Sequence, residues 1–343
     1  MIRICIRVSA IGLLYLLAGS TCAQAAPAAY TPLHNSLMDQ ARTAIIARDY
    51  KKAEQLYTRA IEADFSDPSG WGARSVNRES LGNKEDAFRD NSTYIAAEYV
   101  LGLNDRDQDV FNLELASAYR RNAEYWYKKD DLLRAYVESS VAVRVDKTSG
   151  SGYWAEAWLA HADNLYALGD YDQAQTCLGF AQGILAATLH IDPKTVRSYT
   201  REGARQNALK HKPFQEMVDL RSQFSAAQRA DESGDTKLAF SIYNAIIEIQ
   251  PTNETGWIDR GILYAKNRLP GLAIDDFTTA IDLGAVKGFG STHVALVDRA
   301  VVYNSEGKFM ESYIDLQYAH KLKPDDKDIA AKLALVKSKI GSK

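Results

Sequence analysis

The 343-residue sequence is poor in the residues that break helices or cross-link a chain. Its eight prolines are too few to interrupt a chain of this length often. Of its three cysteines, Cys5 and Cys22 fall near the start, so neither a disulfide framework nor a cysteine-rich zinc domain is expected. The 41 basic and 44 acidic residues nearly cancel. The resulting net charge of −3 gives no reason to expect nucleic-acid binding by the chain as a whole.

Hydrophobic runs long enough to cross a membrane are also missing from the sequence. The run over residues 8–18 is about half as long as the ~20 residues that a membrane-spanning helix needs. It follows Arg3 and Arg7 and precedes an A-x-A cleavage site that ends at Ala25. We therefore predict that residues 1–25 are a signal peptide cleaved near Ala25. The mature protein is then periplasmic or secreted and has no transmembrane segment.

Two other fates of the N-terminus stay open. Residues 17–19 resemble the start of a bacterial lipoprotein signal, but Ser20 stands where the lipid-bearing cysteine belongs. Cys22 follows Gly19-Ser20-Thr21, which fits that signal poorly. An uncleaved anchor is the second alternative. Cleavage without lipidation is the favoured interpretation of the three.

Small residues recur along the chain at a fixed distance from tryptophans. A small residue lies sixteen positions after a tryptophan in the pairs Trp71–Ala87, Trp158–Ala174 and Trp257–Ala273. A glycine precedes the later small residue by five positions in four places, which are Gly82, Gly169, Gly234 and Gly307. Glycine tolerates the positive φ at which one helix stops and another begins. The pattern predicts a helix, a glycine turn and a second antiparallel helix.

These residues resemble the tetratricopeptide repeat family, and the chain is identified as an exported bacterial member of it. The best unit, residues 254–285, has Trp257, Gly261, Tyr264, Ala273 and Phe277 at the places of the family's pattern. We count seven units, which begin near residues 34, 68, 116, 155, 220, 254 and 293. The resemblance implies an all-α, right-handed superhelical solenoid of antiparallel helix pairs. Its concave groove, lined by the first helix of each pair, would receive an extended segment or a helix.

The spacing of the units predicts the domain organisation. Residues 34–188 hold about four units, of which the third has an uncertain register near Asp130 and Asp131, and residues 220–324 hold three. Between them, residues 189–219 are an irregular basic helical insert, a lengthened helix or a degenerate eighth unit. Residues 325–343 form a capping helix, because Ile329, Val336 and the residues between them place apolar side chains at helical spacing.

Signatures of catalysis are missing from the sequence. The six histidines have no metal-ligand spacing, and no phosphate-binding loop follows a predicted strand. Cys177 has no partnering base nearby in the sequence. We therefore predict a protein that is not an enzyme and that holds no cofactor and no metal.

Two polar features have a functional and a structural interpretation. Asp259-Arg260 and Asp298-Arg299 recur at corresponding places, either as ligand contacts or, as we favour, as polar bridges between units. The second feature is a basic stripe, which is at helical spacing if its segment is helical and is either a binding ridge or ordinary solvated surface. Its residues are Lys194, Arg197, Arg201 and Arg205.

The leading functional prediction is a non-catalytic exported scaffold that binds a protein or peptide, with a role in envelope assembly, secretion or polysaccharide export. The alternative is direct binding of an anionic polymer or lipid headgroup through residues 194–212. Besides the basic stripe, the predicted partner-binding residues, which would face the groove, are Arg42, Arg120, Glu124, Tyr127, Asp163, Tyr166, Phe224 and Gln228. Met38 and Arg42 replace the opening residues of the family's carboxylate-binding pattern, which disfavours a chaperone-tail adaptor.

Overall fold

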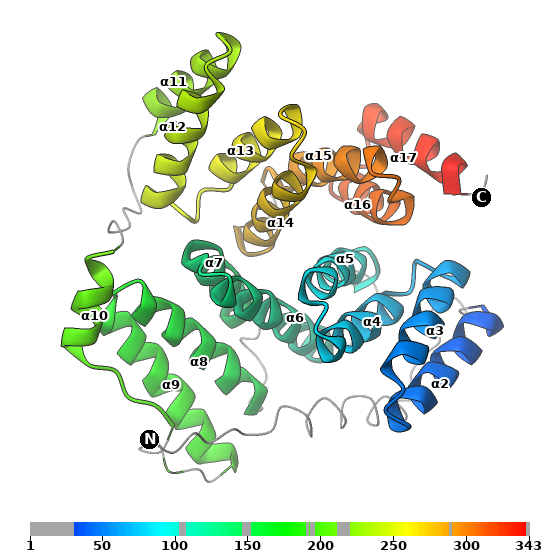
Figure 1. Ribbon diagram of the computed structural model, residues 1–343, viewed down its shortest axis with the longest axis horizontal. Helices are drawn as coiled ribbons and strands as arrows, with labels where there is room; N and C mark the ends of the chain where they lie inside the picture. Colours follow the sequence, from blue (N-terminus) through cyan, green and yellow to red (C-terminus); the bar gives the residue numbers. More distant parts are fainter. Residues whose placement is uncertain are drawn as a thin grey trace. The chain divides into compact units, whose positions relative to one another are not determined.

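The computed structural model describes residues 31–102, 108–145, 152–189, 192, 196–210, 220–287 and 290–340. The predicted signal peptide and Lys194 lie outside these residues. All regular secondary structure in the described ranges is helical, as Figure 1 shows. The predicted all-α solenoid of antiparallel helix pairs is confirmed. The chain divides into two compact units, residues 1–94 and 95–343.

Seven helix pairs follow one another in the described residues. We call the two members of each pair its first and second helix. They are α2 (Pro32–Ile46) with α3 (Tyr50–Ala63), α4 (Pro68–Leu81) with α5 (Lys84–Gly102), α6 (Gln108–Lys128) with α7 (Leu132–Val145), α8 (Gly152–Ala167) with α9 (Tyr171–Leu189), α11 (Arg221–Glu232) with α12 (Thr236–Ile249), α13 (Glu254–Lys266) with α14 (Pro270–Lys287), and α15 (Thr292–Ser305) with α16 (Phe309–Leu322). The short helix α10 (Arg201–Ala208) precedes α11, and α17 (Lys327–Ile340) follows α16.

In each pair, the turn between the two helices contains a residue with left-handed backbone conformation, that is, with positive φ. The four predicted glycines do so with φ of 72–92°. The other three pairs turn at Arg48, Asp130 and Arg268, with φ of 58–62°. In all seven pairs the next residue donates its backbone N–H to the carbonyl five positions before it, as Asp49 does to Ala44 and Asp131 does to Trp126. This assigns the register of the third pair, which the sequence left uncertain.

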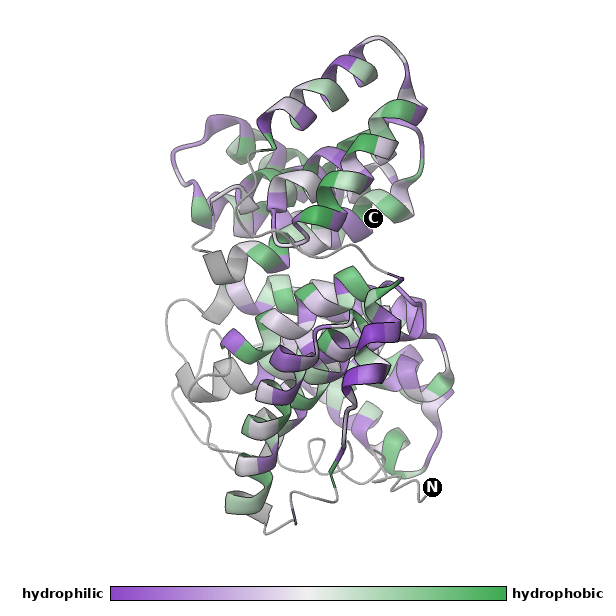
Figure 2. Ribbon diagram, turned by 90° about the vertical axis from the view of Figure 1, so that its left-hand side faces the viewer, coloured by the Kyte–Doolittle hydropathy of each residue, from purple (hydrophilic) through white to green (hydrophobic). Residues whose placement is uncertain are grey.

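Small residues allow the helices of a pair to approach closely. Ala53, Ala135, Ala174 and Ala273 have no exposed surface. A Cβ atom on Gly261 would lie only 2.8 Å from a ring carbon of Phe277. The helices are amphipathic, with hydrophobic and hydrophilic residues interleaved along each ribbon (Figure 2). The repeated small positions of the sequence therefore mark helix contacts, because a larger side chain there would overpack them.

The last helix, α17, covers the end of the seventh pair. Ile329 and Val336 are buried, and Val336 packs with Ala300 of α15 and Leu316 of α16. The predicted apolar stripe therefore faces the seventh pair. Within the described residues, no helix combines the length and hydrophobicity needed to traverse a bilayer.

We expect Arg268→Gly to stabilise the protein by about 0.5–1 kcal/mol. An L-residue in the left-handed region costs about 1–2 kcal/mol, and part of the gain is offset by the greater freedom of glycine in the unfolded chain. The Arg268 side chain is exposed, so little packing is lost. Urea unfolding followed by circular dichroism measures the change. Gly307→Ala, at the matching turn, should destabilise by a similar amount. A loss of stability in Arg268→Gly would contradict the argument.

Candidate partner-binding surface and buried polar seam

Five predicted binding residues lie on two neighbouring first helices. They form what we call the α6–α8 surface, made of Arg120, Glu124, Tyr127, Asp163 and Tyr166. Arg120 joins the helices, because it pairs with Glu124 on α6 at 2.8 Å and with Glu156 on α8 at 3.5 Å. Burial, and then the nearby charge of Asp163, raise the pKa of Tyr127. The structure therefore brings these five residues together on two neighbouring first helices.

A non-helical segment of the chain, residues 196–200, lies against this surface. Arg197 donates a hydrogen bond to Asp163, and the Tyr199 hydroxyl donates another to Asp163 Oδ1 at 2.6 Å. The Tyr199 ring stacks on Tyr166 with 4.5 Å between centroids and 17° between planes. Burial raises the pKa of Asp163, and the positive charge of Arg197 opposes that shift. Two of the predicted binding residues are thus occupied by the chain itself.

The basic stripe would be at helical spacing only if its whole segment were helical, and the structure does not meet that condition. Residues 197–200 are not helical, and α10 begins only at Arg201. Thr200 has φ −118° and ψ 144° and caps that helix, because its hydroxyl accepts from the Gly203 N–H at 3.1 Å. An extended N-cap residue separates Arg197 from the helix that carries Arg201 and Arg205. Lys194 falls outside the described residues.

The remaining predicted residues are not part of the α6–α8 surface. Arg42 belongs to residues 1–94 and pairs with Asp39 on its own helix at 2.7 Å. Phe224 is half-buried and packs on Tyr243 with 6.5 Å between ring centroids, so it belongs to the core of the fifth pair. Gln228 is exposed and donates to Glu232 one turn later at 2.9 Å.

Three arginines on first helices make the same set of contacts. Each donates Nε and Nη2 to a carboxylate sixteen residues later at 2.7–2.8 Å, in the pairs Arg74–Asp90, Arg260–Asp276 and Arg299–Asp315. Each also donates Nη1 to the second helix of the preceding pair at 2.7–3.2 Å, and the acceptors are Thr58, Asn244 and Thr278. The bridge between units that was favoured for Arg260 and Arg299 is confirmed. The sequence analysis missed Arg74, which the sixteen-residue spacing to an aspartate could have revealed.

The neighbouring aspartates have a different environment from these arginines. Burial raises the pKa of Asp259 on α13 to about 6, and the charge of Asp298 adds to the effect. Burial also raises the pKa of Asp298 on α15 to about 6. Each Asp-Arg pair therefore divides its roles, since the arginine bridges units while the aspartate remains a separate, partly buried acid.

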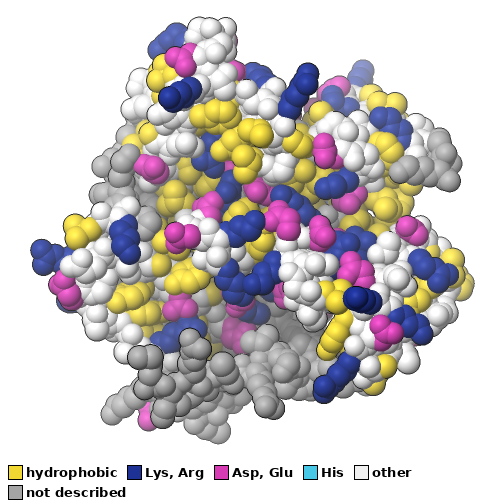
Figure 3. Space-filling view, in the orientation of Figure 1, with side chains coloured by type: hydrophobic (Ala, Val, Ile, Leu, Met, Phe, Trp, Pro, Cys, Tyr) yellow, Lys and Arg dark blue, Asp and Glu magenta, His cyan; other side chains and the backbone are white. Residues whose placement is uncertain are grey.

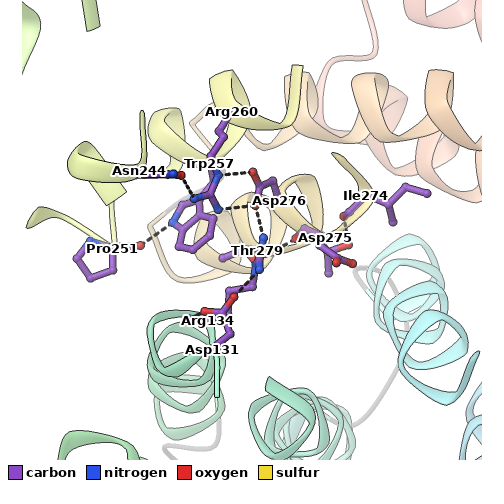
Figure 4. Close-up of polar contacts among 11 residues, drawn as sticks. Asp131, Arg134, Asn244, Pro251, Trp257, Arg260, Ile274, Asp275, Asp276 and Thr279 are labelled. Atoms are coloured by element: carbon purple, nitrogen blue, oxygen red, sulfur yellow. Dashed lines mark hydrogen bonds and ion pairs between the residues drawn. The ribbon is translucent and has the colours of Figure 1, made fainter. Parts of the chain in front are cut away.

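Within residues 95–343, a buried polar seam joins two second helices that are far apart in sequence (Figure 4). Arg134 of α7 donates to Asp276 of α14, which also accepts from Arg260. The guanidinium of Arg134 lies 4.6 Å from the ring centroid of Trp126 and 5.2 Å from that of Trp257. In a solenoid each repeat is expected to contact its sequence neighbours. The seam adds a contact between the third pair and the sixth.

Two carboxyl groups, Glu138 of α7 and Asp282 of α14, face each other farther along the seam. Both are fully buried. Burial raises both pKa values, and the charge of Asp282 raises that of Glu138 further, while Asn122 and Arg134 oppose this. Two carboxylates so close together in a dry site cannot both ionise readily. The pair therefore retains a proton at neutral pH.

Aromatic residues continue the seam between α5 and α16. Tyr99 stacks on Tyr318 with 5.3 Å between centroids and 7° between planes. The Tyr119 hydroxyl donates to that of Tyr99 at 3.4 Å, and Lys321 donates to the carbonyl of Val100. Salt bridges, a carboxyl pair and stacked tyrosines thus connect α7 with α14 and α5 with α16.

The described ranges contain no group of histidine, cysteine, aspartate and glutamate arranged to hold a metal. Burial raises the pKa of the Cys177 thiol to about 11, so it is protonated and a poor nucleophile at neutral pH. Burial lowers the pKa of His161 to about 4, and its Nδ1 lies 2.9 Å from the Ser139 hydroxyl. Neither residue has the environment of an activated catalytic group.

Comparison with known proteins finds similarity in fold and over one short stretch. No family model matches the chain. Over 100 residues it is 31% identical to serine/threonine-protein phosphatase 5 of Rattus norvegicus and of Homo sapiens. That stretch is 29% of this chain and 19% of each phosphatase, so the chain spans about a fifth of these relatives.

Similar solved structures include a tetratricopeptide repeat protein from Parabacteroides merdae, at TM-score 0.35 and 12% identity, covering 89% of this chain and 98% of that one. The TPR2AB domain of yeast Sti1, solved in a complex with pHSP90, has TM-score 0.31 and 14% identity and covers 90% and 98%. The C-terminal part of a repeat protein from Cytophaga hutchinsonii has TM-score 0.32 and 16% identity and covers 86% and 99%.

Proposed function

We propose that this chain, whose seven described helix pairs are arranged as a solenoid like tetratricopeptide repeats, is a non-catalytic, exported scaffold for a protein or peptide partner. The observation that carries the proposal is the α6–α8 surface, which combines paired charges, a carboxylate acceptor and a tyrosine ring on two first helices. Such a surface offers hydrogen bonds and stacking to an extended segment.

Export is supported by the sequence of residues 1–25, which has the basic head, the hydrophobic run and the cleavage site of a signal peptide. A periplasmic or secreted scaffold of this family would serve envelope assembly, secretion or polysaccharide export. That assignment rests on analogy with the family, because a fold alone does not determine a function.

Direct binding of an anionic polymer or lipid headgroup through residues 194–212 is the less favoured function. Arg197 already pairs with Asp163, and Arg201 pairs with Asp172 at 3.0 Å. On the face shown in Figure 3, lysines and arginines are interspersed with aspartates and glutamates. Ion pairs of this kind reduce the positive charge that an anionic polymer would meet.

The proposal is tested by locating the protein and capturing its partner in the native cell. We expect the mature N-terminus at Ala26 and a protein cross-linked to the chain in intact envelopes. Arg120→Ala combined with Tyr127→Ala should reduce capture at least five-fold. Lys237→Ala, an exposed change on the second helix α12, is the matched control and should not. Retention of Met1 would refute export, and capture of a glycan without any protein would refute the scaffold.

A further inference from the structure

The segment over residues 196–200 presents two side chains to the same acceptor. Arg197 and Tyr199, two positions apart, both reach Asp163, while Ser198 between them is exposed. The Tyr199 ring adds the stack on Tyr166. The contacts are those of a short peptide lying across a first helix.

The segment and the helix that follows it make separate contacts. In the segment, the side chain of Arg197 is 45% exposed, whereas Tyr199 packs against the buried residues between α8 and α9. In α10, Ala204 is buried, and Asn207 donates to the Tyr166 carbonyl at 2.9 Å. A Cβ atom on Gly203 would lie 1.9 Å from the Tyr166 hydroxyl, so α10 fits closely against α8. These contacts of α10 involve neither Arg197 nor Tyr199.

We propose that residues 196–200 are an intramolecular ligand of the α6–α8 surface, and that a partner binds there as an extended segment with an arginine two residues before a tyrosine. This inference rests on the proposed scaffold function and specifies its partner. Asp163 accepts from the arginine and from the tyrosine hydroxyl, and Tyr166 supplies the stacking face. Beside them, Arg120 pairs with Glu124 and Glu156, and Lys128 pairs with Glu124. These two positive and two negative charges offset each other, so the recognition charge of the surface is that of Asp163.

Occupation by the chain itself controls access to the surface. A tethered segment has an effective concentration in the millimolar range, so a free peptide of the same chemistry competes poorly. A partner must displace the segment, and removing the side chains of Arg197 and Tyr199 must expose the surface. The opened protein is therefore the form that binds a free peptide.

The test uses a fluorescein-labelled peptide of residues 196–201 and fluorescence anisotropy with the full chain. Arg197→Ser combined with Tyr199→Ser should bind the peptide at least ten-fold more tightly than the unmodified protein. Adding Asp163→Asn to this opened variant should remove the gain. Arg201→Ser, which changes the next arginine and leaves Asp163 occupied, is the matched control and should bind as the unmodified protein does. An opened variant with normal circular dichroism that gains no affinity would overturn the inference.

Limited digestion with trypsin provides a second measurement that does not depend on the opened variant. Asp163→Asn should speed cleavage after Arg197 at least five-fold, because it releases the segment. Asp172→Asn, which instead frees Arg201, should leave that cleavage rate unchanged. Equal rates in the two variants would overturn the inference. Partner capture in cells that survives Asp163→Asn would leave the scaffold function standing while excluding this surface. Binding of the peptide to the opened variant, together with no captured partner in cells, would support this surface and contradict the scaffold function.

Discussion

Arg299→Ala is expected to lower the free energy of unfolding by about 3–5 kcal/mol. The side chains of Arg299 and Asp315 are each 2% exposed and are joined by two hydrogen bonds of 2.7–2.8 Å. Burial raises the pKa of Asp315, and the charge of Arg299 opposes that shift. Without the arginine, a buried carboxylate has lost its counter-charge, and Thr278 loses the donor that bridges it to the next pair. Urea unfolding at neutral pH, followed by circular dichroism, measures the loss.

Two further variants test whether the loss of stability comes from leaving a buried charge unpaired. Arg299→Met combined with Asp315→Leu should recover most of the loss, since replacing both partners leaves no unpaired charge. Arg42→Ala breaks an exposed pair with Asp39 and should cost less than 1 kcal/mol. If Arg299→Ala were no more costly than Arg42→Ala, the bridge between units would contribute nothing to stability.

The sequence was sufficient to predict the helix pairs because their determinants are local. Close helix contacts require alanine and left-handed turns favour glycine, so both residues recur at fixed spacing in the sequence. The structure has all four predicted glycines at turns. Arg48, Asp130 and Arg268 adopt the same conformation without such a signal. There the backbone hydrogen bond that closes each turn outweighs the preference of the residue.

The candidate binding surface was predicted only in part, because contacts between distant segments leave no periodic signal. The pattern of first helices selected Arg120, Glu124 and Tyr127 on α6 and Asp163 and Tyr166 on α8, and these two helices are neighbours in the structure. It did not reveal that Arg197 reaches Asp163. The helical spacing of Arg197, Arg201 and Arg205 assumes a continuous helix, but the backbone at Thr200 is extended. Local spacing carries no information about which carboxylate an arginine reaches.

The seam could not be predicted for the same reason. Arg134 and Asp276 lie 142 residues apart. Glu138 and Asp282, read in the sequence, are ordinary acids of amphipathic helices, which are usually exposed. Only the packing of α7 on α14 makes them a buried pair, and that packing gives them a property that can be measured.

Glu138→Gln is expected to reduce the loss of stability that the protein shows as the pH rises. The ordinary pKa of a carboxyl group in the unfolded chain is about 4. In the folded protein, burial raises the pKa values of both Glu138 and Asp282, and the charge of Asp282 raises that of Glu138 further. Above pH 4 the folded state therefore binds more protons than the unfolded state. The contribution of the pair is fully present below pH 4 and declines as pH rises, by about 1.4 kcal/mol per pH unit for each proton held.

The ionisable groups around the carboxyl pair do not reverse this decrease of stability with rising pH. Arg134 and Arg299 remain charged throughout the range, and burial raises the pKa values of Tyr99, Tyr119 and Tyr318, so these tyrosines stay neutral. Other acids with raised pKa values, such as Asp259 and Asp298, titrate in both proteins and cancel in the difference. His161, whose pKa is lowered, cancels in the same way. The difference between the two proteins therefore reports the carboxyl pair.

The measurement is a series of urea unfolding curves between pH 5 and pH 9 for the unmodified protein and for Glu138→Gln. Glutamine keeps the size of the side chain and removes one ionisable group, so the advantage of the variant should grow steadily with pH. Glu62→Gln, an exposed change on the second helix α3, should give curves that track the unmodified protein at every pH. Parallel pH profiles for Glu138→Gln and the unmodified protein would mean that the pair is ionised in the folded state. The seam would then contain two ionised carboxylates that are shielded from water. Because both side chains are buried, that state is higher in free energy than one in which the pair retains a proton.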